Sequence, residues 1–123
     1  MLVTAADGRL LMVHDRLRRE WSYPAGYVDP GEDPLAAAVR ELAEEVNIQL
    51  APERLQHAAT EIISRPLGKL EFTTYTAGVT AADTAHFRLQ ALELTDYRWV
   101  TPTEAIELTS SRLRPRLRKL LAV

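Results

Sequence analysis

Cysteine is absent from this chain of 123 residues. Disulfide bonds and thiolate metal sites are therefore excluded, and any bound metal would need oxygen or imidazole ligands. Long hydrophobic runs are also missing, since no segment approaches the roughly 18 apolar residues that a transmembrane helix needs. The opening residues, MLVTAADGRL, lack the basic stretch and apolar core of a signal peptide. We therefore expect a cytoplasmic protein with no membrane partner.

An excess of positive charge is likewise missing. The chain has 15 basic and 17 acidic residues and a net charge of -2, which argues against stable nucleic-acid binding by phosphate neutralisation. Almost all of the basic residues are arginine, a choice that suits bidentate contacts with phosphate but also fits a general preference for arginine over lysine. The length and the 46% apolar content predict one domain, residues 1–123, with its own core.

The spacing of apolar residues and turn signals predicts short strands with helices packed against them. Asp7 and Gly8 form a hairpin signal, while Asp33 and Pro34 have the types favoured at the start of a helix. We expect strands at 1–5, 10–14, 58–64, 70–79 and 97–100, and helices from Asp33 to about Val46, from 101 and over 111–123. This pattern indicates an α+β or α/β domain.

The last predicted helix is basic and amphipathic. Leu113, Leu117, Leu120 and Leu121 form one stripe, which we expect to pack on the sheet in preference to an anionic surface. Pro115 is tolerated only in the first turn, so the helix cannot begin much before residue 111.

The most informative segment is residues 26–48, GYVDPGEDPLAAAVRELAEEVNI. Its spacing is G-x5-E-x7-R-E-U-x-E-E-x-G-U, where U is a bulky aliphatic residue. The matching residues are Gly26, Glu32, Arg40, Glu41, Leu42, Glu44, Glu45 and Ile48. This spacing resembles the signature of the Nudix hydrolases, and Asn47 stands where that family has glycine. The resemblance implies a Nudix-type α/β/α sandwich with a mixed β-sheet.

Three carboxylates lie close together on the helix of this segment. Glu41, Glu44 and Glu45 are related as i, i+3 and i+4, beside the apolar stripe, which places neighbours about 5–6 Å apart between Cβ atoms. A solvated acidic face is the ordinary outcome of such a cluster. A divalent cation would turn the repulsion into coordination, and oxygen ligands suit Mg²⁺ or Mn²⁺.

The resemblance also assigns roles. It implies that Glu41 and Glu45 are primary metal ligands, that Glu44 is a ligand or orients water, and that the Gly26 carbonyl adds a further ligand. Arg40 would orient the carboxylates and pair with Glu32, although a helix pair with Glu44 is also available. The general base is a glutamate of the segment or Glu93, which lies six residues before Trp99. We expect Asn47 to close the helix in a left-handed conformation.

By resemblance, the reaction is hydrolysis of a nucleoside diphosphate linked to a further group, such as a nucleoside triphosphate or ADP-ribose. A nucleotide-binding domain without catalysis and a hydrolase of non-nucleotide diphosphates are the alternatives. Arg16, Arg18, Arg19 and Arg65 are candidates for phosphate contacts, and Tyr75 is a candidate for base stacking. Because the chain begins almost inside its first strand, we expect a homodimer in which the second subunit completes the pocket.

Overall fold

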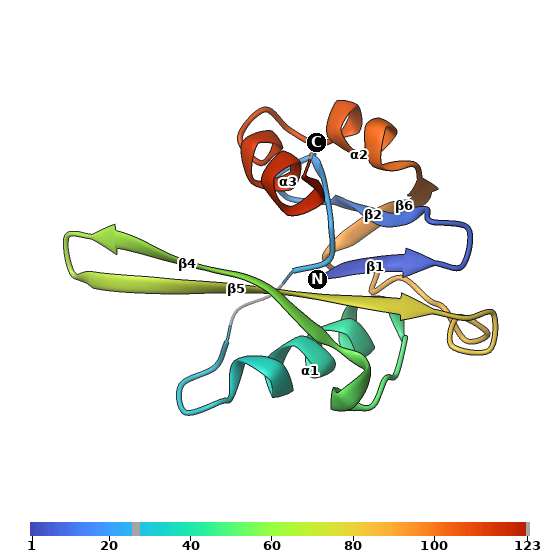
Figure 1. The fold of residues 1–123 in the computed structure, drawn as a ribbon, viewed down its shortest axis with the longest axis horizontal. Helices are drawn as coiled ribbons and strands as arrows, with labels where there is room; N and C mark the ends of the chain where they lie inside the picture. The colour runs from blue at the N-terminus through green and yellow to red at the C-terminus, as the bar shows by residue number, and fades with distance from the viewer. Residues whose placement is uncertain (26–27, 123) are drawn as a thin grey trace.

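Six strands form one mixed sheet in the computed structural model, which describes residues 1–25 and 28–122 (Figure 1). In chain order the elements are β1 (Leu2–Ala5), β2 (Leu10–Asp15), β3 (Trp21–Ser22), α1 (Pro34–Val46), the 3-10 turn η1 (Pro52–Arg54), β4 (Gln56–Arg65), β5 (Gly68–Val79), β6 (Leu94–Val100), α2 (Pro102–Leu108) and α3 (Arg114–Leu121). The predicted α+β class with a mixed sheet is confirmed.

The strand order explains why the sheet is mixed. The path runs β3-β2-β1-β5-β4, in which β1 and β5 are parallel and the other neighbours are antiparallel. β6 pairs antiparallel with β2 from Leu10 to Asp15. Because β6 takes that whole edge of β2, β1 and β3 share the opposite edge, with β1 pairing at Leu10 and β3 at Val13 and His14. The chain segment that connects the parallel strands β1 and β5 contains α1.

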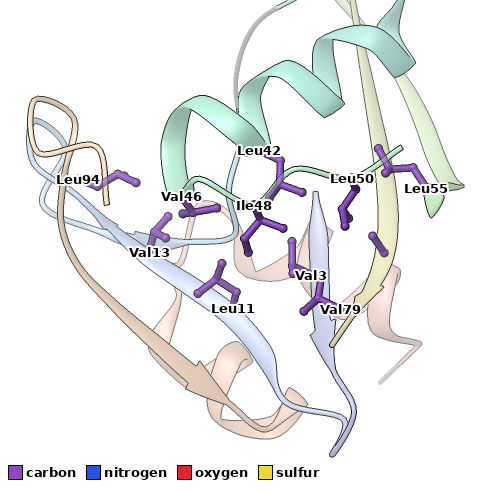
Figure 2. Packing of buried hydrophobic residues seen from close by; sticks show 11 residues of the cluster. Val3, Leu11, Val13, Leu42, Val46, Ile48, Leu50, Leu55, Val79 and Leu94 are labelled. Carbon is purple, nitrogen blue, oxygen red and sulfur yellow. The ribbon is translucent and has the colours of Figure 1, made fainter. Parts of the chain in front are cut away.

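The central strands are buried on both faces. Val3, Leu11 and Val13 point to one face and meet Leu42 and Val46 of α1, as Figure 2 shows. These strand residues are at most 2% exposed. Helix α1 therefore covers this face of the sheet, and its apolar stripe is the one that the sequence predicts.

The opposite face carries the alternate residues of the same strands. Leu2, Leu10 and Met12 pack with Ile106 of α2 and Leu117 of α3. Figure 1 shows α2 and α3 on the side of the sheet away from α1. Two covered faces explain the uninterrupted apolar runs of β1 and β2, because neither face needs polar residues. In the described part of the chain, no helix has the length and hydrophobicity needed to cross a bilayer.

Helix α1 begins and ends as its sequence predicts. The carboxylate of Asp33 accepts a hydrogen bond from the Ala36 amide at 3.2 Å, and Pro34 occupies the first turn, where its missing N–H costs nothing. Asn47 closes the helix with φ 55° and ψ 39°, and its amide donates to the Ala43 carbonyl. The expected left-handed closure at Asn47 is confirmed.

Of the two C-terminal helices, α2 begins where the sequence predicts and α3 is shorter than predicted. Thr101 and Glu104 form a reciprocal capping box at the start of α2, with both hydrogen bonds at 3.2 Å. The prediction of a helix over 111–123 is wrong at its start, since α3 begins at Arg114. The Ser110 carbonyl accepts hydrogen bonds from both the Leu113 and Arg114 amides, so a separate turn precedes the helix. Leu117 is fully buried, which confirms that the leucine stripe packs inward.

Strands β4 and β5 form a long hairpin that projects from the body of the molecule (Figure 1). Both strands are longer than the predicted 58–64 and 70–79, because the ladder continues to Arg65 and Gly68 at the turn. β1 pairs with β5 only from Thr76 to Val79. Among the described pairings, residues 68–75 of β5 therefore have β4 as their only neighbour.

Candidate functional site

The three clustered carboxylates of α1 lie in different environments. Glu44 is exposed, Glu41 is half-buried, and Glu45 is only 6% exposed. One carboxylate oxygen of Glu45, Oε2, is buried and has no hydrogen-bond partner among the described residues. A buried carboxylate without a partner is costly to a fold. Glu45 therefore does not occupy this position because it stabilises the fold, and we look for a functional reason.

Arg40 connects this acidic face to the loop before the helix. Its Nε and Nη2 donate to the two carboxylate oxygens of Glu32, both at 2.8 Å. Its Nη1 donates to Glu41 at 3.0 Å and to Glu44 at 3.1 Å. Both pairings considered from the sequence, Arg40 with Glu32 and Arg40 with Glu44, are thus present. A forked, charge-assisted contact of this kind fixes geometry as well as adding energy.

The charges of the site shift the acidities of its carboxyl groups in opposite directions. The Arg40 guanidinium lowers the pKa of Glu32 to about 2. Burial, followed by the charge of Glu41, raises the pKa of Glu45 to about 8, and burial also raises the pKa of Glu41. The carboxylate of Glu93 adds to both upward shifts, which places its charge near the cluster. Neighbouring groups with strongly shifted pKa values are typical of functional sites.

The terminal amine of Met1 is also buried beside this cluster. It donates a hydrogen bond to the Pro24 carbonyl at 2.8 Å. Burial lowers the pKa of this amine to about 5, while Glu45 opposes the shift. The amine offsets only part of the rise in the pKa of Glu45.

A cleft of about 120 Å³ opens in front of these carboxylates. Its walls are α1, the segment leading into that helix, and strand β5. The lining residues are Met1, Pro24, Ala25, Val28, Pro34, Ala37, Ala38, Glu41, Leu42, Glu45, Leu70, Glu71, Phe72, Thr73 and Tyr75. No arginine or lysine side chain is among these described lining residues. The cleft is therefore an apolar groove with an acidic floor, and the predicted stacking residue Tyr75 lies in its wall.

A loop of residues 80–93 closes the C-terminal end of α1. The amides of Arg88 and Gln90 donate to the carbonyls of Val46 and Glu45 at 3.0 and 2.8 Å. Glu93 lies at the end of this loop, exposed, in the turn before β6. Sequence reasoning does not identify Gln90, whose only available signal is its position three residues before Glu93.

The predicted phosphate-binding arginines do not gather at the cleft. Arg16 Nε donates to the Ala91 carbonyl at 3.1 Å, which joins the loop after β2 to the loop carrying Glu93. Arg16 and Arg19 line a second, shallow depression together with Glu93. Arg18 faces Glu20 at 3.9 Å, and Arg65 stands at the hairpin turn, outside both cavities. The predicted ligand Gly26 lies outside the described residues.

The carboxylate oxygens of α1 are of the type that binds a hard divalent cation. Three carboxylates share one helix face, and Glu45 Oε2 is a buried oxygen with no partner among the described residues. Within residues 1–25 and 28–122, no three histidine or acidic side chains already converge as a ligand cluster. Glu44 is exposed and bonded to Arg40, whereas Glu45 is buried, so these two carboxylates lie in different environments, while Glu41 and Glu45 both line the cleft.

Comparisons with known proteins define the class. The family model of the NUDIX domain matches residues 1–122. The chain therefore belongs to the Nudix family, whose members are hydrolases of phosphoric anhydrides. Comparison with curated protein sequences gives no significant match.

Solved structures support the same fold. The chain is similar to an Ap4A hydrolase of C. elegans in a binary complex, with 25% identity, a TM-score of 0.73, and coverage of 98% of this chain and 91% of the other. It is similar to the E. coli dihydroneopterin triphosphate pyrophosphohydrolase at 22% identity and a TM-score of 0.72, covering 99% and 92%. A third similar structure is the NUDIX domain of Shewanella oneidensis NrtR complexed with ADP ribose. Its identity is 17% and its TM-score is 0.71, and the match covers 98% of this chain and 82% of the other.

Proposed function

We propose that this protein is a Mg²⁺- or Mn²⁺-dependent pyrophosphohydrolase that cleaves a nucleoside diphosphate linked to a further group. Water attacks one phosphorus of the anhydride, and the substrate is a nucleoside triphosphate or a nucleotide sugar such as ADP-ribose. The observation that carries the proposal is Glu45 Oε2, a buried carboxylate oxygen without a partner among the described residues, in the floor of the cleft.

The charge of the cleft supports the need for a cation. Its described side chains include Glu41, Glu45 and Glu71 but no arginine or lysine. A phosphate chain would be repelled from such a surface unless positive charge entered with it. A divalent cation supplies that charge and, when bound, neutralises phosphoryl oxygens and acidifies water.

The residues of this chain then take distinct roles in the proposal. Glu41 and Glu45 hold the cation, with Glu44 as a third ligand or as the group that orients water. Arg40 keeps Glu41 and Glu44 in place through its fork to Glu32. The general base is a carboxylate of α1 or Glu93.

The cleft wall also suits a nucleoside. Tyr75 and Phe72 border the groove beside the carboxylates, where an aromatic ring can stack on a base. The similar solved proteins support a substrate with a phosphoric anhydride bond, since their names or ligands are Ap4A, dihydroneopterin triphosphate and ADP ribose.

A substrate panel tests the proposal. Purified protein is incubated with nucleoside triphosphates, nucleotide sugars, dinucleoside polyphosphates and inorganic or isoprenoid diphosphates, with Mg²⁺ and with chelator. We expect cleavage of one nucleotide class, abolished by chelator. Cleavage of non-nucleotide diphosphates alone would move the substrate outside the nucleotides. No cleavage by folded protein, with nucleotide-induced thermal stabilisation, would identify a binding domain.

The expected homodimer stays a prediction. Size-exclusion chromatography with light scattering, run on the active sample, would test it. A monomer with full activity would show that one chain forms the whole pocket.

A further inference from the structure

Asn47 makes a contact that the glycine of the family signature could not make. Its backbone is left-handed, with φ 55°, which glycine adopts freely and asparagine tolerates. Its side-chain amide donates from Nδ2 to the His86 carbonyl at 2.8 Å, across 39 residues of sequence. The substitution therefore preserves the helix ending and adds a tie to the loop of residues 80–93.

This tie lies beside two backbone contacts between the same segments. The last carbonyls of a helix have no partner within the helix. Here the Val46 carbonyl accepts from the Arg88 amide at 3.0 Å, and the Glu45 carbonyl accepts from the Gln90 amide at 2.8 Å. With the Asn47 side chain, three hydrogen bonds fasten residues 86–90 to the end of α1.

The fastening extends to Glu93. The Gln90 carbonyl accepts hydrogen bonds from the Glu93 and Leu94 amides at 3.2 and 3.0 Å, which form the turn that presents Glu93. On the other side, the Glu93 carbonyl accepts from the Arg16 amide at 2.8 Å. Residues 86–90 therefore connect the end of α1 to the turn that carries Glu93.

We propose that Asn47 is a positioning residue, which holds residues 86–90 on the end of α1 and thereby fixes Glu93 relative to Glu41 and Glu45. The inference rests on the proposed function for its kinetic consequence. Asn47 is not among the described lining residues of the cleft, and it acts through the loop. Glycine at this position restores the family residue and the same backbone conformation, so Asn47→Gly removes the tie without straining the helix end.

Asp83→Asn is the matched control. Asp83 lies in the same loop and also holds it by side-chain contacts, accepting from Arg54 Nη2 at 2.7 Å and from the Thr80 amide at 2.8 Å. This contact anchors the beginning of the loop, far along the chain from Glu93. Both variants thus weaken the anchoring of the same loop, and only Asn47→Gly removes the side-chain contact next to α1.

The first measurement is amide hydrogen exchange, followed residue by residue. We expect the Arg88 and Gln90 amides to exchange at least about tenfold faster in Asn47→Gly and at wild-type rates in Asp83→Asn. Wild-type exchange in Asn47→Gly would overturn the proposal, because the side chain would then hold nothing. This measurement needs no substrate, so it decides the anchoring even if the proposed hydrolysis fails.

The second measurement is kinetic and uses the substrate identified by the panel. We expect Asn47→Gly to lower kcat by about tenfold with KM changed by less than about twofold, because misplacement of a catalytic group by a fraction of an ångström is expensive. Asp83→Asn should keep the wild-type kcat. A double variant separates positioning from general loosening: in a Glu93→Gln background, Asn47→Gly should cost nothing further. An equal loss in both backgrounds, or no loss from Glu93→Gln itself, would overturn the assignment to Glu93.

Discussion

The guanidinium of Arg40 binds the carboxylate of Glu32 through two parallel hydrogen bonds of 2.8 Å, which join the middle of α1 to the segment that precedes it. The remaining nitrogen of the fork reaches Glu41 and Glu44. One residue thus sets the positions of three carboxylates, and lysine cannot reproduce this arrangement with a single ammonium group.

Arg40→Lys should therefore weaken metal-dependent catalysis and leave the protein folded. We expect kcat/KM to fall by about tenfold or more and the Mg²⁺ concentration for half-maximal rate to rise, measured by metal titration of the initial rate. Arg54→Lys is the control, since Arg54 pairs with Asp83 away from the cleft. An unchanged metal dependence in Arg40→Lys would mean that the fork does not position the ligands.

Glu45→Gln should separate activity from stability. The neutral amide cannot replace a carboxylate as a metal ligand, so we expect turnover to fall well over tenfold. Burial raises the pKa of Glu45 to about 8, which shows that the fold disfavours its charge. In chelator, the melting temperature of Glu45→Gln should therefore equal or exceed that of the wild type. Glu71→Gln, an exposed carboxylate of the same cleft, should change neither quantity. Full turnover in Glu45→Gln would remove Glu45 from the ligand set.

Tyr75 provides a test of base recognition. Its half-buried ring lies in the cleft wall and makes an edge contact with His57, with ring centroids 5.9 Å apart. Base stacking on an aromatic side chain contributes about 1–3 kcal/mol, so Tyr75→Ala should raise the nucleotide KM by about tenfold. Tyr75→Phe keeps the ring and should stay near the wild type. Inorganic diphosphate analogues serve as the internal control, and an equal loss for them would show that the cleft had collapsed instead.

The ion pair of Asp83 predicts a dependence of stability on pH. The hydrogen bond and charge of Arg54 lower the pKa of Asp83 to about 2, below its ordinary 3.8. A lowered acid pKa stabilises the fold above about pH 4, and this contribution is lost as the pH falls through about 2. In denaturant titrations, Asp83→Asn should be less stable than the wild type by the same margin from pH 5 to 7. The margin should shrink below pH 4, and a margin independent of pH would contradict the pairing.

Local signals in the sequence were enough to predict the helix α1 and its two ends. Asp33, Pro34 and the apolar stripe act within one or two turns, so their effect does not depend on the rest of the fold. The order of Arg40, Glu41, Glu44 and Glu45 on one face follows from helix geometry alone. The left-handed closure at Asn47 was likewise predictable, because few residue types tolerate that conformation.

The unpredicted features depend on contacts between distant segments. The burial of Glu45 Oε2, without a hydrogen-bond partner among the described residues, follows from the depth at which α1 packs, which no spacing in the sequence reveals. The contact of Gln90 with the end of α1 joins segments that share no periodicity. The start of α3 at Arg114 reflects a turn made by Ser110, which competes with a helix that the leucine spacing alone would begin earlier.

The β4–β5 hairpin gives the cleft two walls of unequal stiffness. One wall is α1, fixed to the buried core by Leu42 and Val46. The other is residues 70–75 of β5, whose only described strand partner is β4, and a two-stranded ribbon has little rigidity of its own. Bending or twisting of this ribbon, limited by the contact of Arg116 of α3 with Phe72, would change the width of the groove without moving the carboxylates of α1. The spacing of the chemical groups is thus set by the rigid wall, and the size of the group that fits beside them is set by the compliant one.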